Sequence, residues 1–112
     1  MKTLTLLAEE VAELLRQRGD TIVVAETSTG GLISSALLAV PGASAYYKGG
    51  SVLYTYESRK ILLGMKRQDV AGLAPMSEAM VMAFARKAQA QFASTWAIAE
   101  LGIAGPTGVA YG

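Results

Sequence analysis

Three consecutive hydroxyl side chains form the densest group of chemically competent residues in this sequence. They belong to the segment Glu26-Thr27-Ser28-Thr29-Gly30-Gly31. Where a strand turns into a helix, backbone N–H groups and the positive end of the helix dipole can hold a phosphate or an oxyanion. A hydroxyl there could donate or attack, and glycines would let a ligand approach the backbone. The simpler interpretation is that Ser28 or Thr29 caps a helix and that the glycines turn the chain.

The absence of histidine and cysteine limits the chemistry that these hydroxyls could perform. The sequence contains neither residue type. This excludes a Ser-His-Asp triad, a cysteine nucleophile and the usual zinc sites, which depend on imidazole or thiolate ligands. Acid–base work would therefore fall to Lys, Tyr, Asp or Glu, and a hydroxyl is the natural nucleophile if a nearby group can take its proton.

A second polar cluster supplies side chains of the required types. It consists of Tyr54, Tyr56, Glu57, Arg59 and Lys60. A tyrosine with a nearby lysine or arginine can accept a proton or polarise a carbonyl where no histidine exists. The alternative interpretation is a charged helix start with ordinary aromatic packing.

A glycine-rich loop, G-I-A-G-P-T-G, occupies residues 102–108 and follows an apolar run. Neither this loop nor the hydroxyl-rich turn matches the P-loop or the dinucleotide fingerprint. Segments that follow parallel strands meet at one edge of a sheet, where ligands usually bind. We therefore predict that the three hydroxyls and this loop line one pocket, with Tyr54 at its rim.

The flanking sequence supplies the elements that would position these groups. Apolar residues at helical spacing predict helices over residues 3–18, 32–40, 57–64 and 78–92, with Ser77 as the cap of the last. Apolar runs over residues 21–25, 51–56 and 95–101 have strand composition. This alternation predicts an α/β fold with a largely parallel sheet that helices cover.

Composition bounds the domain count and the classes of partner. A chain of 112 residues, 52% of them apolar, is about the size of one domain with its own core. Ten basic and nine acidic residues nearly cancel, which disfavours nucleic acid as a partner. No stretch reaches the ~20 apolar residues that span a bilayer, so no membrane partner is expected. Without cysteines or a signal-peptide pattern, the expected location is cytoplasmic.

The order of the motifs resembles that of the CinA C-terminal domain family. From about Thr21 to Gly108, the E-T-S-T-G-G, Y-T-Y-E-S-R, A-P-M-S-E and G-I-A-G-P segments parallel the family's E-S-C-T-G-G, Y-S-N-E-A-K, G-A-V-S-E and G-I-A-G-P. The resemblance implies a three-layer α/β/α sandwich with a largely parallel or mixed sheet. It also implies hydrolysis of the amide of nicotinamide mononucleotide by a hydroxyl nucleophile assisted by Tyr and Lys, without a metal or organic cofactor.

The sequence departs from the family pattern at functional positions. The family's Ser falls on Thr27 and its Cys on Ser28, whereas its Tyr is retained as Tyr54. The family's Lys falls on Arg59, which cannot lose a proton at accessible pH, and Lys60 follows it. The family domain normally continues further, so we expect residues 1–112 to be one such domain that is truncated at its C-terminal end.

These considerations yield a set of candidate site residues. The candidate catalytic residues are Thr27, Ser28, Tyr54 and Lys60. The candidate substrate-binding residues are Glu26, Thr29, Gly30, Gly31, Arg59, Gly102, Gly105 and Thr107. Three hypotheses stay open: an amidase with a nucleotide substrate, a nucleotide-binding module that has lost catalysis, and a subunit that acts through protein contacts. The sequence also leaves homo-oligomerisation open.

Overall fold

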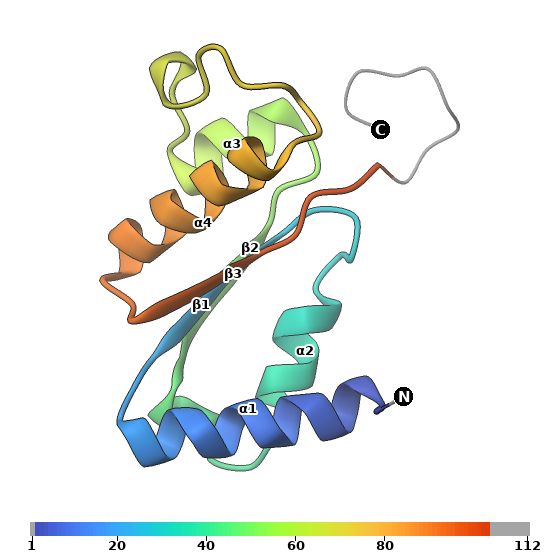
Figure 1. Ribbon diagram of the computed structural model, residues 1–112, viewed down its shortest axis with the longest axis vertical. Helices are drawn as coiled ribbons and strands as arrows, with labels where there is room; N and C mark the ends of the chain where they lie inside the picture. The colour runs from blue at the N-terminus through green and yellow to red at the C-terminus, as the bar shows by residue number, and fades with distance from the viewer. Residues whose placement is uncertain (1, 104–112) are drawn as a thin grey trace.

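A computed structural model describes residues 2–103 of the chain (Figure 1). Within them, a three-stranded parallel sheet has the order β2-β1-β3. In chain order the elements are α1 (Leu4–Arg18), β1 (Ile22–Glu26), α2 (Leu32–Leu38), η1 (Ala43–Ala45), β2 (Tyr47–Val52), α3 (Tyr56–Leu63), η2 (Arg67–Asp69), α4 (Glu78–Phe92) and β3 (Trp96–Ala99).

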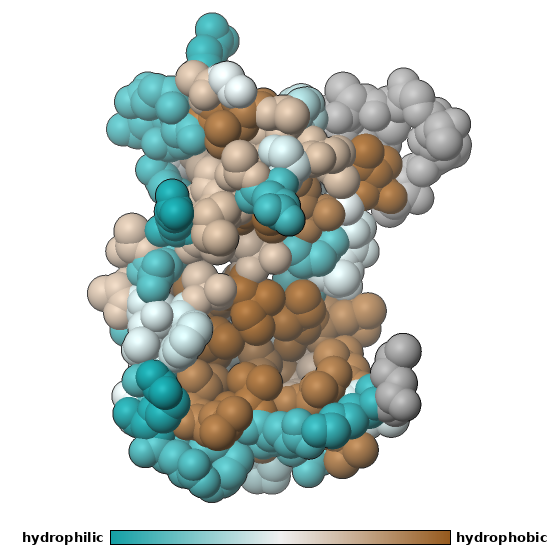
Figure 2. All heavy atoms as spheres, viewed as in Figure 1, coloured by the Kyte–Doolittle hydropathy of each residue, from teal (hydrophilic) through white to brown (hydrophobic). Residues whose placement is uncertain are grey.

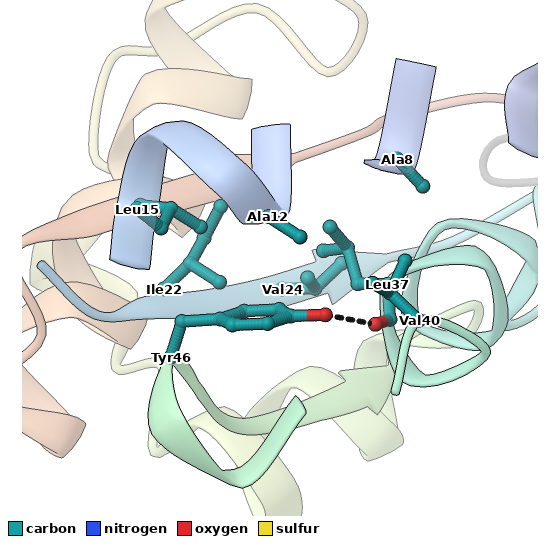
Figure 3. Packing of buried hydrophobic residues seen from close by; sticks show 8 residues of the cluster. All are labelled: Ala8, Ala12, Leu15, Ile22, Val24, Leu37, Val40 and Tyr46. Carbon is teal, nitrogen blue, oxygen red and sulfur yellow. Dashed lines mark hydrogen bonds between the residues drawn. The ribbon is translucent and has the colours of Figure 1, made fainter. Parts of the chain in front are cut away.

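Strand β1 forms the centre of the molecule, because its residues are all buried and alternate between two cores. Ile22 and Val24 pack against α1 and α2, together with Tyr46, whose hydroxyl donates to the Leu37 carbonyl at 2.6 Å (Figure 3). The neighbouring β1 side chains point to the opposite face and pack against α3 and α4. Helices thus cover both faces of the sheet (Figure 1). The predicted three-layer α/β/α fold is confirmed.

Local sequence signals place the helix ends. The Thr3 hydroxyl accepts from the Leu6 N–H at the start of α1, and Gly19 ends that helix in the left-handed conformation. The Ser77 hydroxyl likewise accepts from the Met80 N–H at the start of α4. Side-chain oxygens and left-handed glycines satisfy the backbone groups that a helix leaves unpaired at its ends. The predictions for these two helices are confirmed.

The second strand differs from the prediction. It spans Tyr47–Val52 rather than residues 51–56, because the two glycines that suggested a loop lie inside the strand. A Cβ at Gly49 would lie 2.7 Å from the Phe92 ring, and one at Gly50 would lie 2.6 Å from the Ser34 hydroxyl. Close packing therefore requires glycine here. Beyond the strand, Thr55 caps α3, so the chain has already left the sheet.

Part of the protein surface is apolar. Figure 2 shows apolar atoms gathered on the face in view, above a polar rim at the base where α1 lies in Figure 1. Exposed apolar side chains on α1 and α2 include Leu7, Leu14, Leu32 and Leu38. Among residues 2–103, no helix combines the length and the apolar character needed to traverse a bilayer.

Candidate functional site

Two carboxylates organise the turn between β1 and α2. The first is Glu26, the last residue of β1, whose side chain is buried. Its Oε1 accepts from the Thr29 hydroxyl at 2.6 Å, the Gly31 N–H at 3.2 Å and the Ile33 N–H at 3.0 Å, and its Oε2 accepts from the Ser34 N–H at 3.0 Å. Burial favours a higher pKa for Glu26, but these hydrogen bonds outweigh it and hold the pKa below its usual value. Glu26 thus stays ionised and caps α2.

The second carboxylate is Glu100, which follows β3. Its Oε1 accepts from the Thr27 N–H at 2.8 Å and the Thr29 N–H at 3.1 Å. The Thr29 Oγ1 lies 2.7 Å from the same oxygen, and its single hydrogen serves Glu26 or Glu100 at any one time. The Glu100 Oε2 accepts from the Ser28 hydroxyl at 2.5 Å. Desolvation works to raise the pKa of Glu100, but the donors from Ser28, Thr29 and Thr27 lower it to about 2. Glu100 is not among the candidate site residues predicted from the sequence, although its charge interrupts the apolar run TWAIAEL and could have indicated it.

The hydroxyls of Thr27 and Ser28 have opposite environments. Thr27 is 2% exposed, and its Oγ1 accepts from the Gly102 N–H at 2.8 Å and donates to the Gly102 carbonyl at 3.4 Å. Ser28 is exposed. A Cβ on Gly102 would lie 2.0 Å from the Ser28 Oγ, so the two residues are in close contact. The hydroxyl-rich turn and the start of the second loop therefore meet, whereas Gly105 and Thr107 lie outside the described residues.

Three N–H groups of this turn, which could hold a phosphate or an oxyanion, are engaged within the chain in the described arrangement. The Thr29 N–H donates to Glu100, the Gly30 N–H to the Thr27 carbonyl at 3.2 Å, and the Gly31 N–H to Glu26. Carboxylates of the chain itself thus occupy much of the positive, N-terminal end of the α2 helix dipole. The two glycines serve the backbone conformation, with φ of +62° at Gly30 and +106° at Gly31.

The basic candidates lie on α3 and do not contact these hydroxyls in the described structure. The Arg59 guanidinium is buried and donates to the Leu53 carbonyl at 2.9 Å and to the Tyr54 carbonyl at 3.3 Å. Burial lowers the pKa of Arg59 from its ordinary value. Lys60 is exposed on the same helix. Tyr54 follows β2 at the same end of the sheet as the hydroxyl-rich turn.

A cavity of about 200 Å³ lies beside this edge of the sheet. Its lining includes Tyr56 and Arg59 from α3, Met80 from α4, and Leu101 and Gly102, which follow β3. Because Gly102 also contacts Ser28, the cavity adjoins the hydroxyl group. In residues 2–103, no cluster of three metal-ligating side chains occurs. The available chemistry is a hydroxyl in contact with an ionised carboxylate, next to a partly apolar cavity.

These features define a class of protein: a three-layer α/β domain with a hydroxyl-bearing turn at the carboxyl ends of parallel strands. The family model for the CinA C-terminal domain matches residues 4–112. The chain belongs to that family.

Comparison with individual relatives agrees with this assignment. The chain is 42% identical over 102 residues to a CinA-like protein of Prochlorococcus marinus strain MIT 9313, covering 91% of this chain and 24% of that protein. The chain thus spans about a quarter of the length of such curated relatives.

Solved structures show the same fold. The competence damage-inducible protein A of Klebsiella pneumoniae subsp. pneumoniae MGH 78578 is 32% identical, with a TM-score of 0.84 over 96% of this chain and 67% of that one. A CinA superfamily protein of Enterobacter cloacae is 28% identical, with a TM-score of 0.85 over 97% of this chain and 64% of that one.

Proposed function

We propose that the chain is an amidohydrolase that converts nicotinamide mononucleotide and water into nicotinate mononucleotide and ammonia. The observation that carries the proposal is the Ser28 hydroxyl, which is exposed, lies 2.5 Å from the ionised Glu100 carboxylate and is next to Gly102, a residue that lines a cavity. The substrate comes from the resemblance of the motifs to an amidase family. The proposed reaction involves neither nucleic acid nor a membrane. We also propose that it takes place in the cytoplasm, the location expected from the sequence.

Ser28 is the better nucleophile of the two candidates. Thr27 is buried, and its hydroxyl forms two hydrogen bonds with the Gly102 backbone. Both bonds would have to break before this hydroxyl could attack a substrate. Ser28 is a primary hydroxyl on the surface, with a carboxylate oxygen at hydrogen-bond distance. A nucleophile with a proton acceptor in reach is the arrangement that hydroxyl catalysis requires.

In the proposed reaction, the Ser28 Oγ bonds to the carboxamide carbon as its proton passes to the Glu100 Oε2. A carboxylate of such low pKa is ionised at neutral pH but is a weak base, so proton transfer must accompany formation of the O–C bond. The C–N bond then breaks, and the leaving amine takes the proton from Glu100 and departs as ammonia. Water, which gives its proton to Glu100, attacks the ester carbon and releases the acid, and the proton returns to Ser28.

The roles assigned to Tyr54 and Lys60 stay predictions, because both come from the family pattern. In this proposal the contact between Glu100 and Ser28 supplies the first proton acceptor. Tyr54 closely follows the end of β2 in the sequence. In this proposal it assists the proton transfers at the same sheet edge.

An ammonia-release assay across nicotinamide mononucleotide, nicotinamide riboside and nicotinamide tests chemistry and substrate together. We expect release from the mononucleotide by the purified chain. The control is the double variant Thr27→Ala/Ser28→Ala, which removes both candidate nucleophiles. Equal, background-level ammonia from the chain and this control would refute the amidase proposal.

A second candidate function is nucleotide binding without catalysis. It is favoured by the occupation of the turn N–H groups by Glu26 and Glu100, which reduces the donors left to stabilise an oxyanion. This alternative predicts that nicotinamide mononucleotide raises the melting temperature without forming product, because a ligand that binds only the folded state stabilises it. A melting temperature unchanged by the mononucleotide would contradict it.

The third hypothesis is a subunit that acts through protein contacts or self-association. Sedimentation of the chain as a monomer at micromolar concentration would count against it.

A further inference from the structure

Four basic side chains line one cavity of about 380 Å³ between α3, η2 and α4. They are Arg59, Lys60, Lys66 and Arg67. No carboxylate is among the described residues that line this cavity, and none of the four cations forms an ion pair with a residue of the described part. We call this the basic cavity. Its volume is in the range of small-ligand sites.

The acidic group nearest in sequence is already engaged elsewhere. Asp69 accepts from the Lys87 ammonium at 3.2 Å and from the Lys66 N–H at 2.8 Å, and it lines a different cavity on α4. Asp69 also interacts electrostatically with Lys66, so it offsets part of the charge of the basic cavity, whereas Arg59, Lys60 and Arg67 form no ion pair with a described residue. Clustered cations without a counter-ion repel one another, and a bound anion would relieve that repulsion.

Arg59 distinguishes this cluster from a set of mobile surface lysines. Its side chain is 9% exposed and lies over the rings of Tyr56 and Phe84, at 5.3 and 5.1 Å from their centroids. Its Nε and Nη2 donate to the carbonyls of Leu53 and Tyr54. The guanidinium is thus fixed before any ligand arrives, which lowers the entropy that binding would lose. A fixed, largely desolvated cation attracts an anion more strongly than an exposed one does.

The basic cavity is the neighbour of the smaller cavity that Gly102 lines. Both are lined by Tyr56, Arg59, Val70 and Met80, and the smaller one extends to Gly102, which contacts the Ser28 hydroxyl. Three kinds of surface thus follow one another: the cations of the basic cavity, the mainly apolar side chains of the smaller cavity, and, next to Gly102, a hydroxyl with its carboxylate. A molecule with an anionic tail, a ring and an amide has matching zones.

We propose that the basic cavity binds the phosphate monoester of the substrate, with Lys66 and Arg67 as selectivity residues, while the ring lies in the smaller cavity and the amide faces Ser28. This inference rests on the proposed function, because that function places the amide at Ser28. It adds that phosphate recognition comes from α3 and η2 rather than from the hydroxyl-rich turn, whose Thr29 and Gly31 N–H groups already donate to Glu100 and Glu26.

Equilibrium binding of nicotinamide mononucleotide and nicotinamide riboside by calorimetry tests the proposal without any need for turnover. The two ligands differ only by the phosphate. We expect the wild-type chain to bind the mononucleotide at least about tenfold more tightly, as for one or more charge-assisted hydrogen bonds. Equal affinities would overturn the phosphate site, whether or not the chain releases ammonia. Conversely, a phosphate preference without ammonia would refute the amidase function and leave the site standing.

The double variant Lys66→Gln/Arg67→Gln locates the effect. Both residues lie in exposed positions, so their replacement leaves the core intact, and a thermal melt checks this. We expect the preference for the mononucleotide to fall by about tenfold or more while the affinity for the riboside is unchanged. The matched control is Lys2→Gln/Arg86→Gln, which removes two exposed cations outside the cavity. Its net charge equals that of the Lys66→Gln/Arg67→Gln variant. Equal losses in both double variants, or none in either, would overturn the assignment.

Discussion

The Ser28 Oγ lies 2.5 Å from the Glu100 Oε2, although 72 positions separate the two residues in the chain. The register of β1 and β3 creates this contact, because Ala25 pairs with Ala99 and each strand then delivers its next residues to the same sheet edge. The pair gives the exposed hydroxyl a proton acceptor, and it also anchors the turn to β3. These two roles can be separated by experiment.

Replacement of the two neighbouring hydroxyls should affect different properties. Ser28→Ala should lower ammonia release at least about a thousandfold, because it removes the nucleophile, and should lower the free energy of unfolding by about 1 kcal/mol, because Glu100 loses one donor. Thr27→Ala should instead lower the free energy of unfolding by about 1–3 kcal/mol, because it leaves the Gly102 N–H without its acceptor. Turnover and urea denaturation of both variants check this.

A covalent probe supplies a readout that does not depend on the amide substrate. We expect a fluorophosphonate to label Ser28, with loss of fluoride, and mass spectrometry to locate the adduct. An adduct on Thr27, or full turnover in Ser28→Ala, would assign the attack to the other hydroxyl.

Glu100→Gln should change the pH dependence of stability. The pKa of Glu100 is lowered from 4.5 to about 2 in the folded chain, so its ionised form adds stability that is present above pH 4.5. That stability is lost as the pH falls from 4.5 towards about 2. The difference in unfolding free energy between wild type and Glu100→Gln should therefore shrink across this window, as urea titrations at several pH values would measure. A difference that stays constant with pH would show that Glu100 is not held ionised by the turn.

Gly102→Ala should displace Ser28. The added Cβ would lie 2.0 Å from the Ser28 Oγ and 3.0 Å from the Glu100 Oε2, so the serine must move away from its carboxylate. We expect a loss of about 1–3 kcal/mol in unfolding free energy, as for overpacking elsewhere, together with reduced fluorophosphonate labelling. The same substitution in a Ser28→Gly background should be less destabilising, because the clashing side chain is gone. Equal penalties in the two backgrounds would place the strain elsewhere.

Glu26→Gln should lower the free energy of unfolding and not only the activity. The buried carboxylate accepts four hydrogen bonds, and an amide nitrogen in place of one oxygen would face donors. We expect a loss of about 2 kcal/mol or more, measured by urea denaturation at neutral pH. Glu9→Gln, on the exposed face of α1, makes the same chemical change without a buried partner and should be nearly neutral. Similar losses in both variants would contradict the capping role of Glu26.

Much of the fold follows from the sequence because the signals that specify it are local. Helix α4 begins and ends where its apolar spacing and the Ser77 cap predict, and the apolar run over residues 21–25 forms the buried central strand within one residue. Strand β2 is the exception. Gly49 and Gly50 are typical of a loop in sequence, and only the closeness of Phe92 and Ser34 in the fold explains why a strand needs them.

The lack of histidine and cysteine makes a hydroxyl the natural nucleophile, and the residue order alone shows that hydroxyls gather in the turn after β1. The sequence by itself did not determine which hydroxyl is accessible or which group can take its proton. Those properties depend on the register between β1 and β3, which buries Thr27 against Gly102 and brings Glu100 to Ser28. A shift of that register by one residue would send the Glu100 side chain to the other face of the sheet. Short-range patterns carry no information about such pairing, because it is decided by how two cores pack on opposite faces of β1.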